Sequence, residues 1–84
     1  MPYEIRFSKV AFEDVKGLTP KLQKKLKDIL TSQISQEPHS GKKLVGDLTG
    51  LYSMRLSFKD RIVYSIDEER KIVYIHRSKT HYGK

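Results

Sequence analysis

Residues 51–77, LYSMRLSFKDRIVYSIDEERKIVYIHR, contain three apolar-rich segments separated by two short polar turns. In segments 51–56 and 61–66 the apolar side chains fall largely on alternate residues, which indicates half-buried strands. Segment 71–77 is apolar enough at its centre to predict a strand inside the sheet. The turns at 57–60 and 67–70 are short, and short connections join neighbouring antiparallel strands. This stretch therefore predicts a three-stranded antiparallel meander.

Upstream of the meander, residues 3–7 alternate in the same way and predict a further strand. Ser8 is placed to cap a short helix, and Gly17 is placed to end it in the left-handed conformation. The side chains expected to face the core from this helix are Ala11, Phe12, Val15 and Leu18.

The pair Thr19-Pro20 predicts a second helix start, a cap followed by proline at the first helical position. Apolar residues then recur at helical spacing up to residue 34, and the helix is expected to end before Pro38. Residues 37–50 read as an irregular loop because glycine and polar residues dominate it. Its apolar members, which we expect to hold it against the core, are Leu44, Val45 and Leu48.

These segments predict an α+β fold: an N-terminal strand, two helices, and then the antiparallel meander. Both helices are expected on one face of a four-stranded sheet, within a single domain covering residues 1–84. The other face of that sheet would carry arginine side chains and the C-terminal segment.

Composition limits what the chain can do. It has no cysteine and only three scattered histidines, which excludes disulfides and argues against a metal site, and we expect no cofactor. Its net charge of +7 favours nucleic acid or an acidic protein as a partner. No apolar run approaches the length of a membrane span, and the start lacks the apolar core of a signal peptide. We therefore expect a cytoplasmic protein with no membrane contact.

Candidate site residues collect on the face away from the helices. Arg55 and Arg61 lie on consecutive strands, and Arg77 ends the last strand before His81 and Tyr82. Arginine forks bind phosphate, and histidine transfers protons near neutral pH. RNA carries its own nucleophile, the 2′-hydroxyl, so this set predicts RNA cleavage without a metal ion.

In that scheme His81 is the general acid, Arg61 and Arg77 hold the phosphate, and Tyr82 stacks on a base or orients the phosphate. Further RNA contacts are predicted for Lys42, Lys43, Tyr52, Arg55 and Lys79. No carboxylate is clearly placed as the general base, because Asp47 reads as a turn residue bonded to its own backbone. His76 alternates with residues 72 and 74, and we interpret it as a structural histidine on the helix-facing side.

Three segments in order, Gly-Asp-Leu-Thr-Gly at 46–50, Arg-Ile-Val-Tyr at 61–64 and His-Tyr at 81–82, resemble the RelE/ParE toxin superfamily of bacterial type II toxin–antitoxin systems. The resemblance spans essentially the whole chain and is greatest to the YoeB/Txe branch. It implies a ribosome-dependent endoribonuclease, or mRNA interferase, in which Arg61 contacts the scissile phosphate and His81 and Tyr82 form the terminal pair. Arg55 and Ser53 fall where RelE places two basic residues, so Ser53 lacks one charge.

One departure concerns the glutamate that acts as base in the YoeB branch, because the matching region here holds Lys42. The resemblance also implies partners: a cognate acidic antitoxin that forms a hetero-oligomer with the chain, and the ribosome with its mRNA. Two alternatives stay open at this point. One is a ParE-type inhibitor of DNA gyrase on the same fold, and the other is an RNA-binding module without catalysis.

Overall fold

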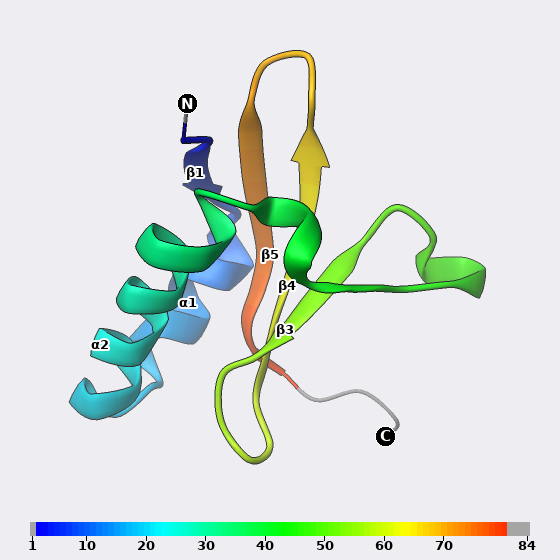
Figure 1. Cartoon of the computed structure of the whole chain (residues 1–84). Helices are drawn as coiled ribbons and strands as arrows, with labels where there is room; N and C mark the ends of the chain where they lie inside the picture. The colour runs from blue at the N-terminus through cyan, green and yellow to red at the C-terminus, as the bar shows by residue number, and fades with distance from the viewer. Residues whose placement is uncertain (1, 81–84) are drawn as a thin grey trace.

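The computed structural model describes residues 2–80 of the 84-residue chain. Figure 1 traces two α-helices beside a sheet. The helical elements are α1 (Lys9–Lys16), α2 (Pro20–Ile29), a π-helical turn η1 (Leu30–Ile34), and two 3₁₀ turns, η2 (Pro38–Ser40) and η3 (Gly46–Leu48). The strands are β1 (Glu4–Phe7), β2 (Lys42–Lys43), β3 (Tyr52–Arg55), β4 (Arg61–Asp67) and β5 (Ile72–Thr80).

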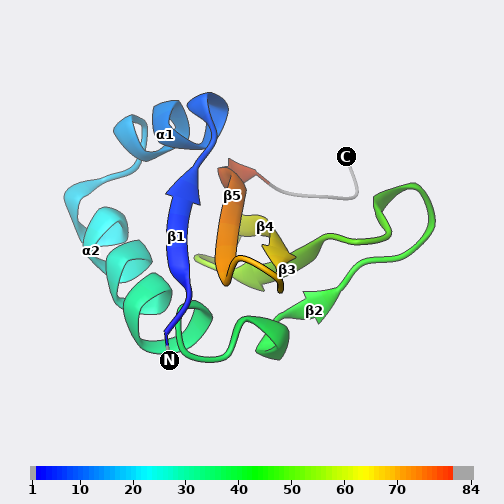
Figure 2. The same ribbon diagram turned by 90° about the horizontal axis from the view of Figure 1, so that it is seen from above.

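The sheet has five strands in the order β1-β5-β4-β3-β2. β1 runs parallel to β5, and the other neighbours are antiparallel. In Figure 2, α1 and α2 lie to one side of the sheet beside β1, and β2 forms the edge of the sheet farthest from β1. The α+β architecture and the antiparallel meander are thus confirmed. The extra strand, β2, is two residues long, too short for the alternation that marks a strand in a sequence.

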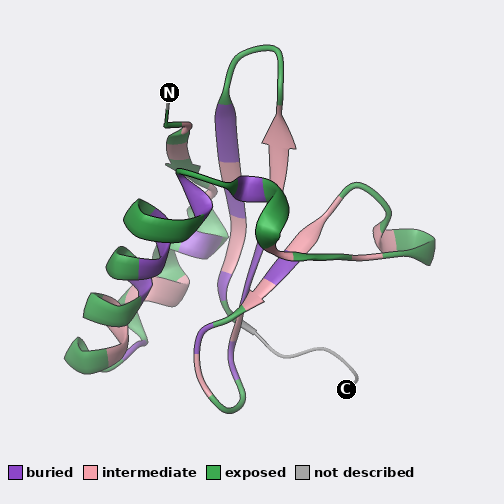
Figure 3. Cartoon of the chain, in the orientation of Figure 1, coloured by how far each residue is buried: buried purple, intermediate pink, exposed green. Residues whose placement is uncertain are grey.

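The core lies between the helices and the sheet, and Figure 3 shows buried residues on the inward sides of both layers. Its fully buried members include Ile34, Tyr64 and Ile75. Burying one large apolar side chain contributes about 1.5–3 kcal/mol, so this layer supplies most of the stabilisation. Phe12 is an exception to the predicted inward face. It is 54% exposed, with the Lys16 ammonium 5.3 Å from its ring centre.

Helix starts follow the sequence prediction, whereas the end of α1 does not. The Ser8 hydroxyl accepts a hydrogen bond from the Ala11 N–H at 3.0 Å, and the Thr19 hydroxyl accepts one from the Leu22 N–H at 3.2 Å. Gly17 is right-handed, with φ −88° and ψ −2°, so the predicted left-handed cap is wrong. The chain leaves α1 by a tight turn in which the Gly17 N–H bonds to the carbonyl of Asp14.

After α2 the backbone widens into the π turn η1, where the Ser35 N–H bonds to the Leu30 carbonyl at 2.8 Å. The widening brings Ser35 against the start of β1. There Ser35 makes two hydrogen bonds with Tyr3. The Tyr3 N–H donates to the Ser35 carbonyl, and the Ser35 hydroxyl donates to the Tyr3 carbonyl. The helix layer is thereby joined to the first strand.

β5 extends past the end of β1, and α1 covers the edge that β1 leaves. Ser8 donates from its N–H to the Ile75 carbonyl and from its hydroxyl to the His76 carbonyl. Further along, one oxygen of Asp14 accepts from the backbone N–H groups of Ser78 at 3.0 Å and Lys79 at 3.4 Å. Ser8 and Asp14 thus take the place of a neighbouring strand along this part of β5.

Asp14 also accepts two hydrogen bonds from the Arg77 guanidinium, from Nε at 2.8 Å and from Nη2 at 3.2 Å. Burial alone would raise the pKa of this carboxyl. The bonds from Arg77, Ser78 and Lys79 outweigh burial and hold the pKa of Asp14 below its usual value. The folded protein therefore favours the negatively charged form of Asp14.

Replacing Asp14 by alanine is expected to lower the free energy of unfolding by about 2–3 kcal/mol at neutral pH, because backbone N–H groups lose a charged acceptor. Urea denaturation measures the loss, with Glu13→Ala as the control. Glu13 is the preceding residue, and its 3.5 Å pair with Lys16 is solvent-exposed and worth less than about 1 kcal/mol.

The difference between wild type and Asp14→Ala should depend on pH. Because the folded pKa is lowered, this stabilisation is fully present above the unfolded value of about 3.9 and is lost as pH falls through the folded pKa. The two denaturation midpoints should therefore converge below about pH 4. A difference that stayed constant down to pH 3 would show that the charge of Asp14 contributes nothing.

His76 lies on the open face of the sheet, the face away from the helices, and not on the helix-facing side that the sequence predicts. The core side of β5 is occupied by Val73 and Ile75, so the next residue along the strand points the other way. The register of β4 and β5 also shifts near this point. The His76 Nε2 atom lies 2.8 Å from the Ser65 hydroxyl, which agrees with a structural role.

Within the described part of the chain, no helix combines the length and apolarity needed to cross a bilayer.

Candidate functional site

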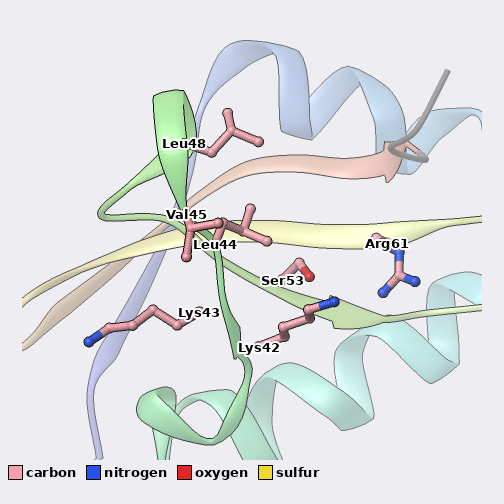
Figure 4. A pocket seen from close by; sticks show the side chains of 7 residues that line it. All are labelled: Lys42, Lys43, Leu44, Val45, Leu48, Ser53 and Arg61. Carbon is pink, nitrogen blue, oxygen red and sulfur yellow. The ribbon is translucent and has the colours of Figure 1, made fainter.

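A cleft of about 490 Å³ opens between the sheet and the segment that joins β2 to β3 (Figure 4). Its lining residues are Lys42, Lys43, Leu44, Val45, Leu48, Ser53 and Arg61. Arg61 opens β4, Ser53 lies on the adjacent strand β3, and Lys42 pairs with Ser53 from β2. The sheet register therefore builds one side of the cleft from three neighbouring strands.

That side of the cleft is cationic. In Figure 4 the ends of the Lys42 and Arg61 side chains approach each other beside Ser53, while the Lys43 ammonium points away. Ser53, a small residue that is only 2% exposed, lies beside the two cations. Arg55 is exposed and directly opposite Arg61 in the β3–β4 register. Like charges placed opposite each other destabilise a sheet, and a bound anion would relieve that repulsion.

The other side of the cleft is apolar. It comes from the arm, residues 44–51, which projects from the body of the protein in Figure 1. Leu44 and Leu48 are half-buried, whereas Val45 is 80% exposed. The prediction that these three residues hold the loop against the core is therefore wrong. The arm turns at Gly46 and Gly50, whose φ angles of +70° and +98° lie in the region that favours glycine.

The start of β2 is held in place by Tyr64, a buried residue of β4. The Tyr64 hydroxyl donates to the Pro38 carbonyl at 2.7 Å, and its ring stacks on that of Tyr52 at 5.6 Å between centres. Burial raises the pKa of Tyr64 to about 12, although a hydrogen bond from the Gly41 N–H opposes the rise. A Cβ added at Gly41 would collide with the Tyr64 hydroxyl, so glycine is required immediately before Lys42.

Removing this hydroxyl should destabilise the fold. In Tyr64→Phe the buried Pro38 carbonyl and the Gly41 N–H lose a partner, and we expect a loss of about 1–3 kcal/mol in the free energy of unfolding. Urea denaturation measures it. Tyr52→Phe is the matched control because it keeps the stacked ring at a half-buried position, and a change within about 0.5 kcal/mol is expected there. Equal effects in the two variants would contradict this account of Tyr64.

Some residues that the sequence assigns to the site lie elsewhere. Tyr52 packs against the core with Tyr64 and has its edge against the His39 ring, because alternation sends its neighbour Ser53 into the cleft. Lys79 lies beside Gly17 at the end of α1. Arg77 is bound to Asp14, so the predicted meeting of Arg77 with Arg55 and Arg61 is not observed.

His81 and Tyr82, the terminal pair predicted for catalysis and stacking, lie outside the described residues, and their roles stay predictions. Among the described residues that line the cleft, none carries a carboxylate. Asp47 is exposed in η3, and the buried Asp60 is bonded to the Ser57 hydroxyl. Within residues 2–80, no cluster of three or more histidine or carboxylate side chains is placed to hold a metal ion.

The apolar wall of the cleft is the feature that the sequence prediction missed. Its signal was present as apolar residues set among turn-forming glycines in segment 44–50, where an irregular surface loop would ordinarily be polar. Two interpretations compete for such residues, namely packing against the core and lining a site. The 80% exposure of Val45 and the projection of the arm from the body of the protein in Figure 1 decide between them.

Comparison with known proteins identifies the family. Residues 5–82 match the family model described as ParE-like toxin of type II bacterial toxin–antitoxin system. Toxin RelG of Mycobacterium tuberculosis is 35% identical over 78 residues, which cover 92% of this chain and 88% of RelG.

Solved structures agree with the sequence comparison. A chain of the RelBE2 toxin–antitoxin complex of M. tuberculosis superposes with a TM-score of 0.86 and 32% identity, covering 96% of this chain and all of that one. The YoeB dimer of Staphylococcus aureus gives a TM-score of 0.81 and 33% identity, covering 98% and 100%. With the match over residues 5–82, these relatives confirm the resemblance drawn from the sequence: the chain belongs to the ParE-like toxins of type II bacterial toxin–antitoxin systems, within the RelE/ParE superfamily.

Proposed function

We propose that this toxin, acting as a single domain of residues 1–84, is an mRNA endoribonuclease that cuts mRNA on the ribosome and so inhibits translation. The observation that carries the proposal is the placement of Lys42 and Arg61 on either side of the buried Ser53, in a cleft where no described lining residue carries a carboxylate. Such a site suits the phosphodiester backbone, because two cations face one phosphate and no negative charge repels it.

The proposed reaction uses groups of the RNA and of the chain and needs no metal ion. The 2′-hydroxyl gives its proton to a water molecule, its oxygen attacks the adjacent phosphorus, and the bond from phosphorus to the 5′-oxygen breaks. Arg61 stabilises the charge that develops on the phosphoryl oxygens, and His81 gives its proton to the departing 5′-oxygen. The products are a 2′,3′-cyclic phosphate and a 5′-hydroxyl end.

Lys42 lies near the position of the glutamate base of the YoeB branch, and in this scheme its ammonium stabilises the negative charge on the attacking oxygen while water takes the proton. Tyr82 stacks on a base or orients the phosphate, and Arg55 and Lys43 contact backbone phosphates outside the cleft. We assign Arg77 a positioning role, because its bonds to Asp14 hold the end of β5 from which the terminal His-Tyr pair continues.

A cognate antitoxin is part of the proposal. The M. tuberculosis relative was solved as a toxin–antitoxin complex, and a YoeB of S. aureus that is 34% identical to this chain was solved as a YoeB–YefM complex. The net charge of +7 indicates an acidic antitoxin that forms a hetero-oligomer with this chain. Co-expression with a small acidic protein encoded next to the toxin should restore growth of cells that the toxin alone arrests.

Cell-free translation with purified toxin, followed by primer extension on the mRNA, tests the nuclease. We expect cuts within codons when ribosomes are translating and none when ribosomes are omitted. Intact mRNA in both reactions would overturn the proposal. Loss of DNA supercoiling in a gyrase assay would then support the ParE-type alternative.

A further inference from the structure

The cleft combines two kinds of surface that a phosphate-binding site alone does not need. Lys42 and Arg61 form one side, and the arm presents Leu44 and Leu48 on the other. The two leucines are half-buried and reachable from the cleft, and Val45 at the tip is 80% exposed. Exposed apolar groups are costly in water, so a cluster of them inside a charged cleft indicates a ligand with an apolar part.

The cations decide which ligand fits. A phosphate held between Lys42 and Arg61 brings the nucleoside attached to it into the same cleft, whose volume of about 490 Å³ falls in the range of small-molecule sites. The apolar part of a nucleotide is the face of its base, and base faces pack on apolar and aromatic side chains. An apolar protein segment fits less well, because it would leave both cations facing it unpaired.

We propose that Leu44 and Leu48 form a base-binding wall, on which the base next to the bound phosphate packs. The inference rests on the proposed function and adds a specificity determinant to it. Leucine side chains have no hydrogen-bond donors or acceptors, so the wall cannot read the Watson–Crick edge. It distinguishes bases by contact area alone, and it therefore favours a purine over a pyrimidine at that position.

Four ribosome-programmed mRNAs that differ only in the base beside the cut test the wall. Single-turnover cleavage by wild type should be faster with a purine than with a pyrimidine by on the order of tenfold. In Leu48→Ala the ratio should fall to within about twofold, because one of the two leucine side chains that pack on the base is removed. Leu48→Met keeps an apolar side chain of similar size and should keep the preference. Asp47→Asn, an exposed residue of the same arm outside the cleft lining, is the control and should keep it too.

An mRNA with an abasic site at that position completes a double-mutant cycle, since a missing base cannot contact the wall. Wild type and Leu48→Ala should cut it at equal rates, and a urea denaturation curve shows that the variant is folded. If wild type and Leu48→Ala showed the same ratio of purine to pyrimidine cleavage rates, the base-binding wall would be wrong, whereas the proposed nuclease activity would be unaffected. Absence of any cut by wild type would instead overturn the proposed function, and the wall with it.

Discussion

Arg61→Ala should cut ribosome-bound mRNA about 10²–10³-fold more slowly than wild type, measured in single-turnover reactions with saturating toxin. Arg61 is the guanidinium that lines the cleft, at the first residue of β4 and beside Ser53. The charge it would stabilise grows as phosphorus becomes five-coordinate, so the loss should fall mainly on the rate of the chemical step. Arg61→Lys keeps the charge and loses the bidentate fork, and an intermediate rate is expected.

The fold should tolerate this change. Arg61 stands opposite Arg55, and removing one of two like charges relieves repulsion in the sheet, so the free energy of unfolding should not fall. Arg70→Ala, in the exposed β4–β5 turn, removes one positive charge away from the cleft and should leave the rate unchanged. If Arg61→Ala cut as fast as Arg70→Ala, the phosphate would not be bound at this cleft.

His81→Gln is expected to slow cleavage about 10²–10⁴-fold, the range for loss of a positioned general acid. Glutamine is similar in length and keeps a hydrogen-bond donor, but it cannot give up a proton near neutral pH. The 5′-oxygen would then leave unprotonated. Primer extension over a time course measures the rate, and a substrate with a better leaving group than the 5′-oxygen should restore much of it.

The chain offers two matched controls for this variant, because it contains three histidines. His39 lies 2.6 Å from Glu68 at the far end of the sheet, and His76 is bonded to Ser65 on the open face. Replacing either by glutamine should leave the rate within about threefold of wild type, since each acts structurally. Full activity of His81→Gln with loss in His76→Gln would transfer the acid role to His76.

Local patterns predict the parts of this fold that depend on local chemistry. Alternation places β3 and β4 correctly, and the Ser8 and Thr19 caps are confirmed because a capping bond joins residues three apart. Local patterns cannot predict β2, because its two lysines form a strand only when Ser53 and Tyr52 pair with them. They cannot predict the exposure of Phe12 either, since the width of the buried stripe on α1 depends on what packs against it.

Some residues of the candidate site can be placed from local patterns in the sequence, and others cannot. Strand order alone places Arg61 beside Arg55, so the paired arginines are predictable from the sequence. Arg77 is not, because the carboxylate that binds it, Asp14, is 63 residues earlier in the chain and meets it only after α1 has docked. Tyr52 also turns away from the cleft, for the sheet has two faces and composition does not say which of them an aromatic residue will occupy.

The hydrogen bonds that Asp14 accepts from the end of β5 also affect how readily the protein aggregates. An uncovered strand edge is a template on which a second chain can add, and this addition begins aggregation and domain swapping. Here the N–H groups of Ser78 and Lys79 already point at a carboxylate, and an incoming strand would have to displace a charge to reach them. We therefore expect the carboxylate to protect this stretch of the sheet from pairing with a second chain, while it holds the strand that leads into the terminal His-Tyr pair.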